Sequence, residues 1–196
     1  MYLPHSYNPT YQSNIASTIV KSLQSHSRVM ALRVDCRFPD GYTYAGQRTA
    51  VITRFFESLK AKVKADLSRK EKQWGRKLVC ELKYAWVREF GDINGKKHFH
   101  VLVLVNKDVY HSLGDYTQAA GTLSAMAQQA WCSATQLPYP DYQHLTHFPD
   151  RGVYYLEANS PDLALQLEKL LNRANYLAKE ATKLYGDGER SFGCSR

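Results

Sequence analysis

The chain has 196 residues, of which 44% are hydrophobic, enough to bury the core of one domain. Its 26 Lys and Arg residues against 18 Asp and Glu give a formal net charge of +8, which favours contact with a polyanion without identifying it. The sequence contains no run of roughly 20 apolar residues, no signal-peptide pattern and no Cys-x-x-Cys pair. We therefore expect a protein of the reducing cytoplasm that does not contact a membrane.

The spacing of apolar residues predicts the first elements in chain order. Residues 1 to 10 are expected to be loose, and residues 13 to 25 to form a short amphipathic helix. A buried strand over residues 29 to 38 is closed by the turn Pro39-Asp40-Gly41, and a second helix runs from about Gln47 to Arg69. The later half of this helix is crowded with Lys60, Lys62, Lys64, Arg69 and Lys70. A cluster of basic residues like this one most often forms only a solvent-exposed face of a helix.

Residues 77 to 90 and 97 to 105 are expected to form two strands joined by residues 91 to 96. The pair Asn94-Gly95 in this connection is a strong signal for a β-hairpin with a two-residue turn. The two strands should therefore be adjacent and antiparallel.

A third helix is predicted from about residue 115 to 134, ending at the turn Pro138-Tyr139-Pro140. Two short strands follow over residues 142 to 148 and 152 to 158. Ser160-Pro161-Asp162 then begins a last helix that is expected to run to about Tyr185. This alternation predicts an α+β fold in which helices cover an antiparallel sheet.

His98 and His100 form the first candidate site. Side chains alternate along a strand, so both imidazoles point to the same face of the sheet. If Asn94 and Gly95 are the two central hairpin residues, paired positions sum to 189 and Glu89 lies directly across from His100. Two imidazoles and one carboxylate suit Mn²⁺ or Mg²⁺, with zinc as a competitor.

Other interpretations of these residues stay open. A histidine on a strand commonly bonds only to a neighbouring carbonyl or to solvent. A longer hairpin loop would shift the register, and a change of parity would turn Glu89 to the other face. Asp35 on the first strand is then the reserve ligand.

Tyr176 is the second candidate. The last helix has an apolar stripe made of Leu163, Leu167, Leu170, Leu171, Ala174, Leu177, Ala178, Ala181 and Leu184. Tyr176 projects more than about 90° from its centre, on a polar, basic face with Asn172, Arg173, Lys179 and Lys183. A free tyrosine hydroxyl has a pKa near about 10 and needs nearby cations or a metal-polarised phosphate to act as a nucleophile.

The simpler interpretation is a surface tyrosine with ordinary lysine neighbours. The other histidines and tyrosines of this half of the chain have no comparable partners in sequence, and we expect them to be structural: His144, His147, Tyr154, Tyr155 and Tyr185.

The sequence resembles the HUH endonucleases, the rolling-circle replication initiators and relaxases. His98-Phe99-His100 looks like their metal motif with Phe in the middle, and Tyr176-Leu177-Ala178-Lys179 looks like their nucleophile motif. Most of the chain looks more narrowly like the filamentous-phage-type replication proteins of enterobacterial prophages and satellites. The segments that carry this likeness are Val29 to Phe38, Trp86 to Glu89, Lys97 to Val105, Asn175 to Lys183 and Arg190 to Arg196.

The resemblance implies a sheet of about five antiparallel strands with the metal on its face and a single catalytic tyrosine. His98, His100 and Glu89 would hold Mg²⁺ or Mn²⁺, and Tyr176 would attack single-stranded DNA at an origin hairpin to leave a 5′-phosphotyrosine. Lys179 would neutralise phosphate charge or assist proton transfer. The residues expected to contact the DNA are Lys97, Asn172, Arg173 and Lys183.

We expect a single nuclease domain over residues 1 to 196, acting in the cytoplasm of a bacterial host cell. Within it, residues 1 to 27 are an N-terminal extension with a short helix, residues 28 to 186 the core, and residues 187 to 196 a C-terminal tail. The sequence has no Gly-x-x-x-x-Gly-Lys-Ser/Thr loop, so unwinding and synthesis would fall to a host helicase and polymerase.

Three other functions remain compatible with the sequence. One is a module that binds single-stranded nucleic acid on the same architecture without cutting it. Another is a relaxase or transposase of the same chemistry. The third is a metal hydrolase of small molecules, which would be active without DNA.

Overall fold

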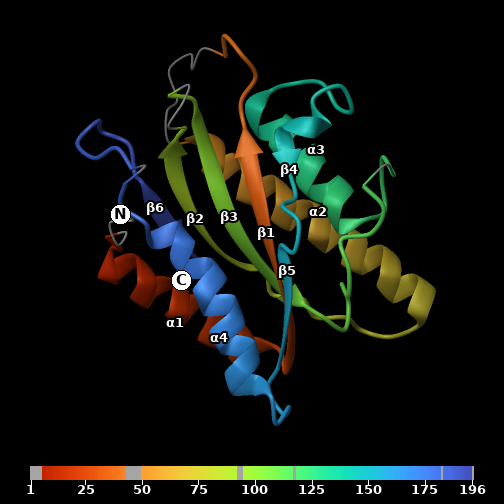
Figure 1. The fold of residues 1–196 in the computed structure, drawn as a ribbon. Coiled ribbons are helices and arrows are strands. Elements are labelled where there is room, and N and C mark those ends of the chain that lie inside the picture. The colour runs from red at the N-terminus through yellow and green to blue at the C-terminus, as the bar shows by residue number, and fades with distance from the viewer. Residues whose placement is uncertain (1–5, 43–49, 92–94, 117, 182, 196) are drawn as a thin grey trace.

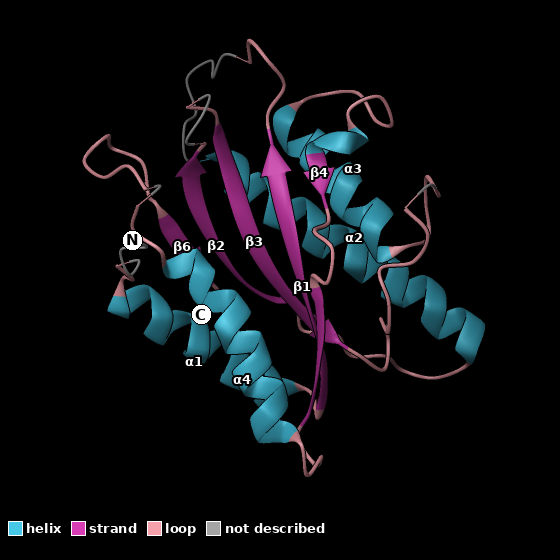
Figure 2. Cartoon of the chain, viewed as in Figure 1, coloured by secondary structure: helices cyan, strands magenta, loops and turns pink. Residues whose placement is uncertain are grey.

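One sheet lies between two layers of helices in the computed structural model, which describes residues 6–42, 50–91, 95–116, 118–181 and 183–195. Helices α1 (Pro9–Ser25) and α4 (Leu163–Ala174) cover one face, and α2 (Ala50–Trp74) and α3 (Leu123–Thr135) cover the other (Figures 1 and 2). The expected α+β fold, with helices on both sides of an antiparallel sheet, is confirmed.

The centre of the sheet is made of three long strands, β1 (Arg28–Arg37), β3 (Lys97–Asn106) and β2 (Lys83–Phe90). β3 lies between the other two and is antiparallel to both. The edges are shorter: β4 (Thr146–His147) and β5 (Val153–Glu157) both pair with β1, and β6 (Phe192–Cys194) pairs with β2. β1 and β2 therefore run in the same direction, and their C-terminal ends lie at the same end of the sheet.

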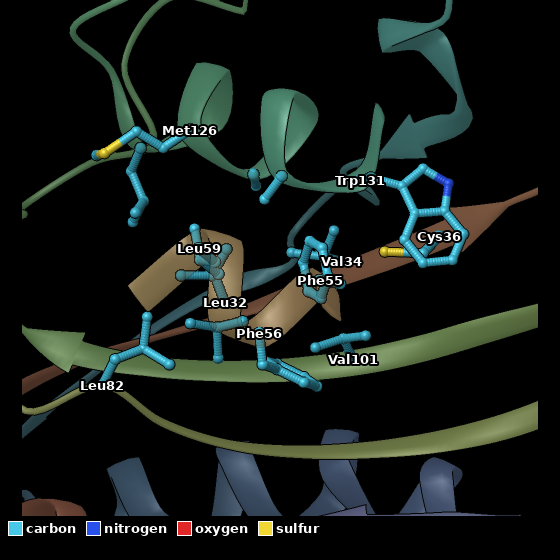
Figure 3. Packing of buried hydrophobic residues seen from close by; sticks show 14 of the residues in the cluster. Leu32, Val34, Cys36, Phe55, Phe56, Leu59, Leu82, Val101, Met126 and Trp131 are labelled. Carbon is cyan, nitrogen blue, oxygen red and sulfur yellow. The ribbon is translucent and has the colours of Figure 1, made fainter. Parts of the chain in front are cut away.

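Successive side chains of the central strands point to opposite faces of the sheet and pack into two separate cores. On one face, Leu32 and Val34 of β1 pack with Phe55 and Leu59 of α2 and with Trp131 of α3 (Figure 3). The other face carries a smaller core beneath α1 and α4, which contains Ile15, Ile19, Val29, Ala31, Leu102, Leu104, Leu170 and Ala174. As predicted from alternation, residues 99, 101, 103 and 105 join the first core while Leu102 and Leu104 join the second.

Several predicted boundaries differ from the structure. β2 begins only at Lys83, because the residues before it turn back toward α2, where the Leu78 N–H donates to the Glu71 carboxylate at 2.9 Å. α3 begins at Leu123 rather than near residue 115, since the Thr122 hydroxyl accepts a bond from the Ala125 N–H and caps the helix there. The predicted strand over 142 to 148 holds a 3₁₀ turn, Gln143–Leu145, before the two residues of β4.

The predicted start of the second helix at Gln47 lies outside the described residues. That helix runs on to Trp74, five residues beyond the predicted end. The strand predicted over residues 152 to 158 is confirmed by β5.

The last helix is shorter than predicted. α4 gives way to a 3₁₀ turn, Asn175–Ala178, and the chain is extended at Lys179 instead of helical as far as Tyr185. The N-terminal segment takes up the backbone groups here: the Asn8 N–H donates to the Ala178 carbonyl at 2.8 Å, and the Glu180 N–H donates to the Ser6 carbonyl at 2.9 Å. These tertiary hydrogen bonds replace the helical ones.

Described residues of both the predicted N-terminal extension and the predicted C-terminal tail pack against the sheet. α1 begins at Pro9, within the segment expected to be loose, and is capped by the Asn8 side chain. Phe192 of β6 stacks on Tyr11 of α1, with ring centres 4.4 Å apart.

Among the residues that the structure describes, no helix has both the length and the apolar character that crossing a membrane requires.

Arg88 ties the C-terminal segment to β2. Its side chain is buried, and its guanidinium donates to the Asp187 carboxylate at 2.8 Å and to the carbonyls of Leu184 and Glu189. Lys97 of β3 also pairs with the Glu189 carboxylate. Ion pairs and backbone bonds therefore hold residues 184 to 189, and Phe192 beyond them packs on α1.

We predict that Arg88→Met lowers the free energy of unfolding by about 3 kcal/mol, because the half-buried carboxylates of Asp187 and Glu189 lose the charged donor that they share. Urea denaturation measures this. Arg190→Met, two residues before β6 and exposed, is the matched control and should cost under about 0.5 kcal/mol. Equal losses in the two variants would contradict the anchoring role.

Candidate metal centre

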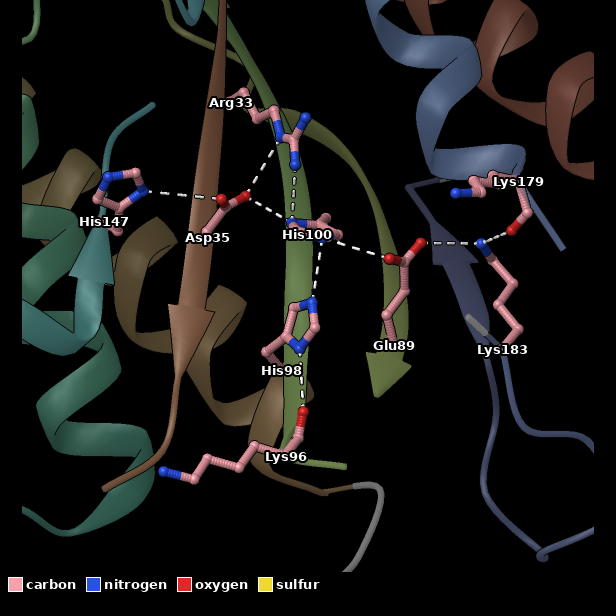
Figure 4. A network of polar contacts seen from close by, with 9 residues as sticks. All are labelled: Arg33, Asp35, Glu89, Lys96, His98, His100, His147, Lys179 and Lys183. Carbon is pink, nitrogen blue, oxygen red and sulfur yellow. Dashed lines mark hydrogen bonds and ion pairs between the residues drawn. The ribbon is translucent and has the colours of Figure 1, made fainter. Parts of the chain in front are cut away.

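All three central strands change from apolar to polar along the face covered by α1 and α4. The apolar part of this face contains Val29 and Ala31, Ala85 and Val87, and Leu102 and Leu104. The next residues in the same rows are Arg33 and Asp35 on β1, Glu89 on β2, and His100 and His98 on β3. Since β3 runs antiparallel to its neighbours, these polar side chains meet at one end of the sheet (Figure 4).

The hairpin register differs from the prediction by two positions. Glu89 pairs with His98, and His100 pairs with Val87. The hairpin closes with a bond from the Gly91 N–H to the Lys96 carbonyl, so four residues lie between them instead of two. Asn94, on which the predicted turn depended, lies outside the described residues. Because the shift is even, Glu89 still faces the two histidines.

Glu89, His98 and His100 each offer one ligand atom, and these atoms all lie within 4.8 Å of one another. The Nε2 atoms of the two histidines are 3.1 Å apart, and Glu89 Oε2 lies 3.3 Å from His100 Nε2. Glu89 and His100 are buried, and His98 is half-buried. Two imidazole nitrogens and one carboxylate oxygen in this arrangement can hold a divalent metal ion.

Asp35 supports this group from the other side of His100. Its Oδ1 lies 2.6 Å from His100 Nδ1. Arg33 Nη2 lies 2.9 Å from the same nitrogen, but the Asp35 contact is shorter and an ionised carboxylate can only accept, so we assign the proton to Nδ1. His100 then donates to Asp35 and keeps its Nε2 lone pair for a metal, the usual arrangement of a ligating histidine.

Buried charges around His100 are compensated in pairs. Burial alone would raise the pKa of Glu89, but His100 and Lys183 lower it to about 2. Burial would likewise raise the pKa of Asp35, which His100 and Arg33 lower to about 2. Both carboxylates are therefore ionised at neutral pH, and each has a cation beside it.

The two histidines respond differently to their surroundings. Burial lowers the pKa of His98 below its usual value. Burial would do the same to His100, but its bonds to Asp35 and Glu89 outweigh burial and raise its pKa. His100 therefore keeps a proton at a higher pH than His98 does.

Tyr176 lies beside this group. The 3₁₀ turn places its ring centre 6.0 Å from that of His100. Arg33 Cζ lies 5.1 Å from the centre of the Tyr176 ring, and Lys179 Nζ lies 5.8 Å from it. Tyr176 is 39% exposed, whereas the next residue, Leu177, is 1% exposed. The structure thus brings together the histidine pair and the tyrosine, which are 76 residues apart in sequence.

Lys183 is not where the sequence suggested. We expected it on an exposed helix face where it would contact DNA, but its side chain has no exposed surface. Its ammonium lies 3.0 Å from Glu89 Oε1 and also donates to the Lys179 carbonyl (Figure 4). Because the chain leaves the helix before Lys183, this side chain turns inward and fixes Glu89.

The other expected DNA contacts are spread around the site. Asn172 is exposed, Arg173 is half-buried, and Lys97 pairs with Glu189. A pocket of about 560 Å³ opens beside the histidines. Its lining includes Asp35, Arg37, Phe38, Lys96, His98, His100 and His144.

Sequence reasoning missed two members of the site. Arg33 was not singled out, although an arginine inside an otherwise apolar strand is a signal that it has a buried partner. His147, expected to be structural, places Nδ1 3.7 Å from Asp35 Oδ2. The pairing of β4 with β1 brings His147 beside Asp35, and sequence spacing does not indicate this pairing.

Comparison with known proteins gives a family. Residues 1–195 match the model of the YagK/YfjJ C-terminal domain. The chain belongs to this family. Two relatives come from Escherichia coli (strain K12). The uncharacterized protein YagK is 37% identical, over 95% of this chain and 92% of the YagK chain. The uncharacterized protein YfjJ is 36% identical, over 97% of this chain and 96% of the YfjJ chain. No solved structure matches this YagK/YfjJ chain.

We predict that His98→Ala and His100→Ala each weaken Mn²⁺ binding at least about tenfold, because each removes one of three ligands. Isothermal titration calorimetry measures the affinity. His111→Ala is the matched control, since His111 is exposed and outside the group. Unchanged affinity in both site variants would rule out this metal centre.

The pH dependence of metal binding follows from His100. Its raised pKa means that a proton competes with the metal above as well as below the usual histidine range. Affinity should therefore rise as pH increases through the usual histidine range and above it, by about tenfold per unit while one proton is displaced. Asp35→Asn removes a negative charge that raises this pKa, so it should move the rise to lower pH. Affinity that is flat over this range would contradict the assignment.

Proposed function

We propose that this protein is a metal-dependent endonuclease that nicks single-stranded DNA through Tyr176. The reaction would leave a 5′-phosphotyrosine and a free 3′-OH, and would initiate rolling-circle replication of a phage, prophage or satellite element. The observation that carries the proposal is the position of Tyr176, half-exposed beside His100 and two cations, at the edge of a three-ligand group.

The residues present fit the metal that such an enzyme requires. His98, His100 and Glu89 supply two nitrogens and one oxygen, and leave coordination positions for water and phosphate oxygens. When bound there, Mg²⁺ or Mn²⁺ supplies positive charge to the oxygens of the scissile phosphate.

The chain's own residues would orient and carry out the transfer. The Tyr176 oxygen forms a bond to phosphorus, the bond from phosphorus to the 3′ oxygen breaks, and the phenolic proton passes through solvent to the departing oxygen. Lys179 neutralises charge on the phosphate, and Arg33 holds the tyrosine ring in place. Attack by a 3′-OH on the phosphotyrosine reverses these steps and rejoins the strand.

Single-stranded DNA suits this site better than a duplex. Tyr176 projects from a short turn, near the His100 ring that lines the pocket, rather than from a helix shaped for a major groove. Arg37 lines the same pocket and offers charge to a backbone entering it, beside Lys96, which pairs with Asp40. An origin hairpin would present the unpaired segment, and a host helicase and polymerase would extend the strand.

The test is formation of a covalent adduct. Protein, Mn²⁺ and single-stranded oligonucleotides from the origin of its own replicon should give a species that survives denaturing electrophoresis. Tyr176→Phe should abolish the adduct, because it removes the attacking oxygen, and should leave DNA binding intact. Tyr185→Phe, an exposed tyrosine nine residues on, is the matched control and should form the adduct normally.

Binding without an adduct from any of these oligonucleotides would overturn the nuclease proposal in favour of a non-cleaving module. An adduct that persists in Tyr176→Phe would show that another residue is the nucleophile.

A further inference from the structure

Positive charge is concentrated far from the candidate metal centre. Residues 60 to 77, the later half of α2 and the turn after it, contain eight basic residues against Asp66 and Glu71. This segment therefore has a net charge of +6, out of +8 for the whole chain. The basic residues are Lys60, Lys62, Lys64, Arg69, Lys70, Lys72, Arg76 and Lys77.

Most of this charge is not compensated within the protein. Asp66 is buried and already bonded to Arg69 and Lys70, at 2.7 and 2.9 Å. Glu71 accepts the Leu78 N–H. Among the described residues, no acidic side chain forms an ion pair with Lys60, Lys62, Lys64, Lys72, Arg76 or Lys77. A surface of this kind attracts a polyanion.

An exposed tryptophan stands among these cations. Trp74, the last residue of α2, is 42% exposed. Lys70 Nζ and Arg76 Cζ lie 5.8 and 5.6 Å from its ring centre. A large exposed aromatic ring with cations around it is the pairing of features that binds unpaired bases, which stack on the ring while the cations hold the phosphates.

A pocket continues this surface along the helix. It has a volume of about 700 Å³ and lies between α2 and the edge of the sheet, where its lining includes Lys60, Lys64, Leu67 and Tyr84. Trp74 follows Leu67 by seven residues, about two helical turns, so it lies on nearly the same side of α2. From Lys60 to Trp74 this side extends for roughly 21 Å, long enough to contact several nucleotides.

This surface does not overlap the candidate metal centre. α2 packs through Phe55 and Leu59 on the core that lies opposite α1 and α4. Tyr176 and the two histidines belong to the face covered by α4, and the end of α2 projects past the sheet on the other side (Figure 1).

We propose that the side of residues 60 to 77 that carries Lys60, Lys64 and Trp74, here called the α2 basic face, binds single-stranded DNA, with a base stacked on Trp74 and phosphates on the lysines. The choice of DNA over RNA rests on the proposed function. The choice of a single strand rests on Trp74, because a duplex would contact the lysines and leave the ring unused. Binding here requires neither Tyr176 nor a metal.

The test uses the full-length Tyr176→Phe protein, so that no cleavage can occur. Its affinity for a fluorescent oligo-dT of about 20 nucleotides is measured by anisotropy at several salt concentrations without added metal. Trp74→Ala should weaken binding about tenfold or more, with little change in the salt dependence, while Trp74→Phe should restore most of it.

Removal of lysine charges, unlike loss of the Trp74 ring, should change the salt dependence of binding. Lys64→Gln with Lys77→Gln should weaken binding and reduce the slope of log affinity against log salt by about 1.4, two phosphate contacts on a single strand. Lys21→Gln with Lys169→Gln is the matched control, since both lysines are exposed on α1 and α4. It should leave the slope unchanged.

Wild-type affinity in both the Trp74→Ala and the double-lysine variants would overturn the proposal. Tighter binding of a duplex or of oligo-U than of oligo-dT would overturn the assignment to single-stranded DNA. The adduct assay with origin oligonucleotides is a separate readout: loss of oligo-dT binding at this face and absence of an adduct at Tyr176 can occur independently, so the two failures are distinguishable.

Discussion

His100 is the residue on which the polar end of the sheet depends. It lies between two buried carboxylates, with Nδ1 bonded to Asp35 and Nε2 close to Glu89. Each carboxylate has its own buried cation, Arg33 or Lys183. The fixed charges of the four side chains therefore cancel while the histidine is neutral. Leaving any one of these charges buried without its partner would be costly, which explains why all five side chains are held together.

This cancellation has a consequence for the proposed chemistry. A divalent cation added to a group that is already neutral leaves an excess of positive charge in a partly buried site. A phosphate of the DNA backbone is the anion that would balance it, so metal and DNA should each favour binding of the other. Lys183 thus sets the position and the ionised state of Glu89, whereas Lys179 beside the Tyr176 ring would contact the phosphate in the proposed reaction.

Strand periodicity predicted more of the site than helix periodicity did. The shared face of His98 and His100 was correct, and Glu89 stayed on it because a shift of two residues keeps the parity of the strand. The same shift made the predicted partner of Glu89 wrong. Helical spacing placed Tyr176 correctly outside the apolar core, but it could not show that hydrogen bonds to the N-terminal segment end the helix before Lys183. Such contacts join residues far apart in sequence, and local patterns do not record them.

The net charge of the chain did not indicate where the charge lies. A formal charge of +8 predicted contact with a polyanion, and residues 60 to 77 hold six of those charges on the opposite face of the sheet from Tyr176. The site itself is nearly neutral, because its cations neutralise its carboxylates. Long-range attraction of DNA would therefore come mainly from the α2 basic face, and the site would select the scissile phosphate by geometry at short range. Dividing these tasks between two faces allows attraction to be strong while the cations that contact the carboxylates of the site, Arg33 and Lys183, stay compensated by Asp35 and Glu89 and repel a bound metal less.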